Sequence, residues 1–76
     1  MNKLSKIVRA HRKKAGLTQK QLADLAGLGK TVIFDIEKGK ETVQFNSLLK
    51  VLNALNISLK AKSRLMENEV TISEKS

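Results

Sequence analysis

Few side chains in this sequence could do covalent or metal chemistry. Cysteine is absent, and the single histidine, His11, has no second His, no Cys and no paired carboxylates at a spacing typical of a metal site or an activated nucleophile. The run GLGKT at residues 27–31 partly matches a phosphate-binding loop, but the first glycine of that motif would fall on Asp24, and no strand precedes it. We therefore expect His11 to be a packing residue. The protein is expected not to be an enzyme and to need no metal or cofactor.

The chemistry that remains is the binding of a polyanion. The 76 residues include 15 Lys and Arg against 7 Asp and Glu, a net charge of +8. Residues 1–40 hold 10 of the basic residues and 3 of the acidic ones, so a basic first half indicates nucleic acid or, less often, an anionic membrane. A basic face kept only for solubility is the plain alternative. Only Phe34 and Phe45 are aromatic, which argues against binding single strands by base stacking.

Short helices must position these charges. Apolar residues at helical spacing predict four of them, over residues 4–15, about 19–26, 30–38 and 45–55. Gly16 and Gly27 suit left-handed positions after the first two helices, and Asn56 can end the fourth in the same way. Thr18 and Gln21 have the spacing of a capping box at the start of the second helix. The expected inner faces are formed by Leu22, Ala23, Leu25 and Ala26, then Val32, Ile33 and Ile36, then Phe45, Leu48, Leu49, Leu52 and Leu55.

Two short helices joined by a glycine-containing turn are the sequence form of a helix-turn-helix. Residues 16–28 (GLTQKQLADLAGL), continued in register by 29–39 (GKTVIFDIEKG), closely resemble the lambda-repressor/Cro-like (XRE-type) helix-turn-helix family. The resemblance covers about residues 4–59. It implies an all-α domain of four or five helices that binds DNA sequence-specifically as a transcriptional repressor, with the third helix in the major groove.

The resemblance also implies which residues contact the bases. These are Gly29, Lys30, Thr31 and Phe34. Lys30 can donate to guanine O6 and N7, while Thr31 offers a hydroxyl and a methyl group. For Phe34 two interpretations stay open, contact with a thymine methyl group or packing beneath a neighbouring helix. Asp35 could accept a hydrogen bond from cytosine, but a role as a cap or as a partner of Lys38 is favoured.

Contacts to the DNA backbone follow from helix ends and lysines. The expected phosphate contacts are made by Thr18, Gln19, Lys20, Lys38, Lys40 and Thr42. Gln19 matches the position that family members place on the backbone, where the helix N-terminus adds N–H donors. Arg12 and Glu37 resemble the family's structural ion pair between the first helix and the end of the third. Two unrelated surface charges are the alternative.

After Asn56 the hydrophobic period changes from 3.6 to 2, which predicts a half-buried strand. No second strand is evident, and a lone strand is unstable, so we expect this strand to pair across a homodimer. The expected dimer strand consists of Ile57, Ser58, Leu59, Lys60 and Ala61. Residues 1–62 are thus expected to form the DNA-binding and dimerisation domain, and residues 63–76 a flexible polar tail.

Residues 56–62 (NISLKAK) resemble the C-terminal strand of HipB-like antitoxins. That resemblance implies an antitoxin of a type II toxin–antitoxin system, which represses its own operon and binds a HipA-like kinase toxin. A stand-alone Cro/XRE-type repressor without a toxin is the alternative, and a basic RNA-binding or nucleoid-coating protein is a third possibility. The expected partners are a palindromic double-stranded operator, a second copy of the chain and the kinase toxin.

No apolar run approaches the ~20 residues that span a bilayer, and no apolar leader stands at the N-terminus. We therefore expect a cytoplasmic protein with no membrane partner, associated with the nucleoid when it is bound to DNA.

Overall fold

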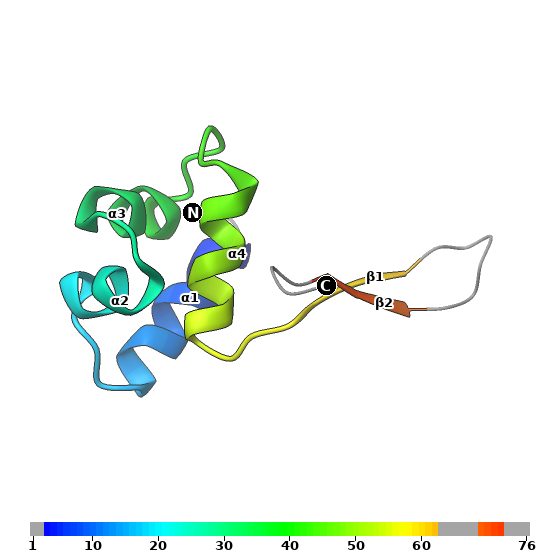
Figure 1. Cartoon of the computed structure of the whole chain (residues 1–76), viewed down its shortest axis with the longest axis horizontal. Coiled ribbons are helices and arrows are strands. Elements are labelled where there is room, and N and C mark those ends of the chain that lie inside the picture. Colours follow the sequence, from blue (N-terminus) through cyan, green and yellow to red (C-terminus); the bar gives the residue numbers. More distant parts are fainter. Residues whose placement is uncertain (1–2, 63–68, 73–76) are drawn as a thin grey trace.

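Four helices and a two-stranded sheet make up the part of the chain that the computed structural model describes, residues 3–62 and 69–72. The helices are α1 (Lys3–Lys14), α2 (Gln19–Ala26), α3 (Lys30–Lys38) and α4 (Phe45–Ala54), and the strands are β1 (Leu59–Lys62) and β2 (Glu69–Ile72). The four predicted helices are confirmed, with each end within one residue of the prediction. Figure 1 shows the helices gathered together and the sheet projecting from them along the long axis.

The ends of α2 are fixed by the residues that the sequence singles out. Thr18 Oγ1 accepts a hydrogen bond from the Gln21 backbone N–H at 3.0 Å, and Gln21 Oε1 accepts one from the Thr18 N–H at 2.8 Å. This reciprocal pair is the predicted capping box. At the other end Gly27 has φ of 71°, a left-handed conformation that a residue without Cβ adopts at little cost. The two caps set the length of α2 and the short turn that leads into α3.

A small core lies where the four helices meet. Its buried members come from every helix: Val8, Leu22, Ala23, Ile33, Ile36, Val51 and Leu52. Ala23 is 1% exposed and sits in α2, which packs against both α3 and α4, so a larger side chain at residue 23 would push the helices apart. Burying each large aliphatic side chain contributes about 1.5–3 kcal/mol.

Two residues predicted to face the core do not do so. Leu25 is 64% exposed and Phe45 is 56% exposed, so both predictions were wrong. Leu25 lies on the opposite side of Leu22 from Ala23, and Leu22 and Ala23 are the two residues of α2 that are buried. Phe45 is the first residue of α4, and the buried residues of this helix, Val51 and Leu52, lie almost two turns further along it.

The sheet corrects the prediction for the C-terminal segment. β1 pairs antiparallel with β2 of the same chain, with Leu59 opposite Ile72 and Lys62 opposite Glu69. The expectation that the chain lacks a second strand was therefore wrong, as was the flexible tail for residues 69–72; residues 63–68 and 73–76 of that tail lie outside the described part. Ile57 and Ser58 precede the strand instead of belonging to it. The physical reason is the β-branched run Val70–Ile72, which favours extended backbone.

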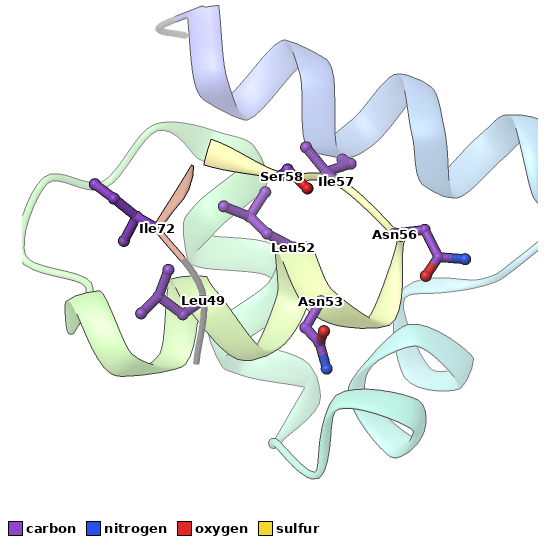
Figure 2. Close-up of a pocket in the computed structure, with 7 residues that line it drawn as sticks. All are labelled: Leu49, Leu52, Asn53, Asn56, Ile57, Ser58 and Ile72. Carbon is purple, nitrogen blue, oxygen red and sulfur yellow. The ribbon is translucent and has the colours of Figure 1, made fainter. Parts of the chain in front are cut away.

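A cavity of about 140 Å³ lies where the sheet meets α4. Leu49 and Leu52 of α4, Ile57 and Ile72 are among the residues that line it, and Figure 2 shows Leu49 beside Ile72 of β2. Ile57 and Leu59 also pack against the core. The sheet is thus attached to the helices by apolar side chains near the ends of its strands.

Candidate nucleic-acid interface

The predicted base-contacting residues lie together on one exposed stripe of α3. Gly29 is the N-cap of the helix, with an extended conformation, and Lys30 and Thr31 form its first turn. Lys30, Thr31 and Phe34 are exposed, whereas Ile33 and Ile36 on the opposite side are buried in the core. Lys30 and Thr31 form no side-chain hydrogen bond or ion pair with any other described residue. Their donor and acceptor groups are therefore available to a ligand.

The N-terminus of α2 presents backbone donors next to this stripe. The capping box uses the N–H groups of Thr18 and Gln21, which leaves those of Gln19 and Lys20 without an intrahelical acceptor. Gln19 Nε2 lies 3.4 Å from Glu37 Oε1, so its side chain is oriented toward the end of α3. An amide nitrogen carries two N–H groups, and one of them remains for a phosphate. Two adjacent backbone donors and a side-chain amide are a suitable set for an anion.

Arg12 and Glu37 form the predicted ion pair. Arg12 Nε lies 2.6 Å from Glu37 Oε2 and Nη2 lies 3.0 Å from Oε1, a bidentate contact between side chains that are 11% and 5% exposed. Arg12 Nη1 also donates to the Leu17 carbonyl at 2.9 Å. The hydrogen bond and the charge of Glu37 raise the pKa of Arg12 above its ordinary value, although burial acts in the opposite direction. The pair joins α1, the loop before α2 and the last turn of α3.

The lysines at the end of α3 and just after it make contacts within the chain that were not predicted. Lys38 Nζ lies 5.4 Å from the centre of the Phe34 ring, within the range of a cation–π contact. Asp35 pairs with Lys40 at 3.6 Å, so the expectation that it pairs with Lys38 was wrong. Phe34 is 48% exposed, which contradicts packing beneath a neighbouring helix. Lys38 lies one helical turn beyond Phe34, on the same side of α3, so its ammonium group reaches the ring. Lys40 lies just past the Gly39 cap, from where its side chain reaches Asp35.

Two further predicted phosphate contacts, Lys20 and Thr42, are exposed. Lys20 pairs with Asp24 at 3.4 Å, with both side chains well exposed, and such a pair is weak in water. Thr42 is exposed in the loop between α3 and α4. The structure thus brings Gln19 and Lys38 together with Phe34 of the α3 stripe around one groove.

One basic residue near the stripe was not predicted. Arg9 lines an open groove of about 390 Å³ together with Arg12, Gln19, Phe34, Glu37 and Lys38. The signal was present in the sequence, because Arg9 precedes Arg12 by three positions and so lies on a neighbouring part of the same helix face.

Other kinds of site are not seen in the described residues. No group of three or more His, Cys, Asp and Glu side chains there is placed to hold a metal ion. His11 is exposed, and its Nδ1 donates to the Ile7 carbonyl at 2.8 Å, so the expectation that it is a packing residue was wrong. Nor is any described helix both long enough and apolar enough to cross a membrane.

Comparison with known proteins agrees with this arrangement. Residues 8–61 match the model of a helix-turn-helix family. The chain is 43% identical over 53 residues to an uncharacterised HTH-type transcriptional regulator, y4mF, of Sinorhizobium fredii, a match that covers 70% of each protein. It is 36% identical over 56 residues to the control protein C.SmaI of Serratia marcescens, covering 74% of this chain and 67% of that protein. The chain therefore belongs to the lambda-repressor-like (XRE-type) helix-turn-helix family of DNA-binding regulators.

Proposed function

We propose that this protein is a sequence-specific transcriptional repressor that reads the major groove of duplex DNA with the first turns of α3. The observation that carries the proposal is the exposed stripe of Gly29, Lys30, Thr31 and Phe34, held beside the N-terminus of α2. A recognition helix contacts base edges with its N-terminal residues, while neighbouring helix ends contact phosphates. The stripe and the α2 amides supply these two kinds of contact from one face.

Selection of bound duplexes from a random pool tests this function. A repressor enriches one site and binds it ~10³ times more tightly than random DNA, or better. A nucleoid-coating protein enriches no sequence, and an RNA-binding protein prefers single-stranded or structured RNA over the duplex. Enrichment of a palindrome supports the proposal, and failure to enrich any duplex sequence contradicts it.

A homodimer is the second element of the proposal. A two-stranded sheet has marginal stability by itself, and β1 and β2 project from the helices in Figure 1. Pairing with the sheet of a second copy would extend it and cover its apolar residues. Two recognition helices related by a two-fold axis would then read half-sites about 34 Å apart, or a multiple of this distance.

The third element is the role of an antitoxin. The sequence resemblance of residues 56–62 to HipB-like antitoxins supports it, and α3 and the sheet come from separate parts of the fold, so a kinase toxin could bind away from the DNA-reading stripe. Co-expression with the product of the neighbouring gene tests this role by growth and by co-purification. If there is neither a complex nor rescue of growth, the protein is a stand-alone repressor. That outcome leaves the DNA-binding proposal unchanged.

A further inference from the structure

The groove beside the recognition stripe has an unusual charge balance. Three of its lining side chains are cations, Arg9, Arg12 and Lys38, and one is an anion, Glu37. Both oxygens of Glu37 are already bound by Arg12, at 2.6 and 3.0 Å. The groove therefore keeps two positive charges without a matching carboxylate among the residues that line it.

These two cations differ in how they are held. Arg9 is exposed, and its guanidinium makes no hydrogen bond or ion pair within residues 3–62 and 69–72. Lys38 lies against the Phe34 ring, which restricts its ammonium group to the rim of the groove. A guanidinium with five N–H donors and a nearby fixed ammonium are well suited to the oxygens of a phosphodiester.

The groove also lies where the C-terminal half of α3 would approach the DNA backbone. Phe34 and Lys38 follow Lys30 at intervals of four, so the groove continues the base-reading stripe toward the C-terminal end of α3. With the first turns of α3 among base edges, the last turns approach the sugar–phosphate backbone at the edge of the major groove. Gln19, at the N-terminus of α2, lines the same space.

We propose that Arg9 of α1 and Lys38 of α3 bind a backbone phosphate of the DNA in this groove. Phe34 is then a positioning residue whose ring holds Lys38 in place. Within the stripe, Gly29, Lys30 and Thr31 remain as the residues that read bases. This inference rests on the proposed function, because it adds α1 to a surface that otherwise consists of α2, α3 and the loop after α3. It assigns to Arg9 a contact that sets affinity and register without specifying sequence.

The salt dependence of binding to a random-sequence duplex tests the inference, because each neutralised phosphate contributes about 0.9 to the slope of log K against log salt. Arg9→Ala should reduce the magnitude of that slope by about 0.9 for each bound copy. It should also weaken binding at low salt by about fivefold per copy, equally on random and selected DNA. Arg9→Lys should retain the slope. Phe34→Leu should weaken binding to both kinds of DNA by the same, smaller factor and leave the preference for the selected site unchanged.

Lys14→Ala is the matched control. It removes the same charge from the same helix, but Lys14 lines a separate cavity with Ala54 and Leu55. Thermal melting of each variant confirms that it is folded, which is expected because Arg9, Phe34 and Lys14 are exposed. If Arg9→Ala and Lys14→Ala change the slope equally, or neither changes it, the assignment of Arg9 is wrong. If the unmodified chain binds no duplex at all, the proposed function itself fails, and the two failures are thereby distinguished.

Discussion

At the scale of single residues, Glu37 is the point where three parts of the fold meet. It accepts two hydrogen bonds from Arg12 of α1 and lies 3.4 Å from the amide nitrogen of Gln19 at the start of α2. Glu37 itself belongs to the last turn of α3. The direction of the recognition helix relative to α1 and α2 is therefore fixed by a nearly buried carboxylate, in addition to the apolar core.

The first prediction concerns this ion pair. Removal of one partner leaves the other charge buried without compensation, so Arg12→Ala or Glu37→Ala should each lower the free energy of unfolding by about 3 kcal/mol. The double variant should lose less than the sum of the two, because the second substitution removes the unpaired charge. Urea denaturation of the four proteins measures the coupling. Additive losses would show that the two residues do not interact.

The same pair gives a prediction for pH. The pKa of Arg12 is raised in the folded state, so the stabilisation that this cation provides is complete at every pH below its ordinary pKa and is lost only as the pH rises through the raised value. The difference in unfolding free energy between the unmodified chain and Arg12→Ala should thus be constant between about pH 7 and pH 10. Denaturation curves across that range check it. A difference that declines before about pH 10 would contradict the assignment.

At the scale of elements, the turn between α2 and α3 depends on one backbone conformation. Gly27 has φ of +71°, while Gly29, two residues later, has φ of −78°. A Cβ added at either position would meet no atom within 4 Å. The two glycines therefore differ in backbone strain and not in available space.

This pair supplies the third prediction. Gly27→Ala should lower stability by about 1–2 kcal/mol, because a residue with Cβ is strained at positive φ. Gly29→Ala should cost less, about 0.5–1 kcal/mol, because a φ of −78° suits any residue and only the preference of an N-cap for glycine over alanine is lost. In a chain of this size the first change corresponds to roughly 4–8 °C or more in Tm. Equal melting temperatures for the two variants would contradict the account of the turn.

Sequence alone could predict the four helices and their caps because those signals are local. The capping box of Thr18 and Gln21, the left-handed Gly27 and the left-handed Asn56, with φ of 57°, all depend on neighbouring residues only. The Arg12–Glu37 pair is not local, and it was accessible only through resemblance to a family in which these positions are paired. The hydrogen bond from Arg12 to the Leu17 carbonyl was not predicted, because it depends on the path of the loop before α2.

What sequence reasoning missed depends on how the elements pack. Leu25 has the spacing of an inner-face residue, but whether another helix covers that side of α2 is a property of the assembled fold. Strand β2 has only four residues, and its β-branched run Val70–Ile72 was overlooked in a segment expected to be a polar tail. The spacing of Arg9 from Arg12 places both on one face of α1, but the groove that Arg9 shares with Lys38 depends on how α1 packs against α3.

At the scale of the whole molecule, the sheet is the feature that most requires a partner. The chain has 76 residues and a small core, and below about 70–80 residues a single core rarely supplies more than a few kcal/mol. Association of two copies through the sheet would add buried area and would set the spacing of the two recognition helices. Dimerisation and palindromic recognition are thus linked in this account.

The fourth prediction follows from that link. The protein should sediment at about twice 8.4 kDa. Leu59→Pro should shift it toward the monomer, because proline lacks an N–H and weakens the β1–β2 sheet through which the two copies are proposed to associate. Leu25→Ser, which removes an exposed leucine from α2, should leave the mass unchanged. The Leu59→Pro variant should also bind a full palindrome more weakly. A monomer at high micromolar concentration would contradict the dimer.

The central claim is that the first turn of α3 reads DNA sequence, and the most direct test compares one substitution on two DNAs. With the selected palindrome and a random duplex as ligands, Lys30→Ala should cost about 1–3 kcal/mol on the palindrome and much less on random DNA. Gln19→Ala and Lys40→Ala are the matched variants, and each should weaken both ligands by a similar factor. If Lys30→Ala lowers the affinity for both DNAs by the same factor, Lys30 contacts only the backbone, and the claim is contradicted.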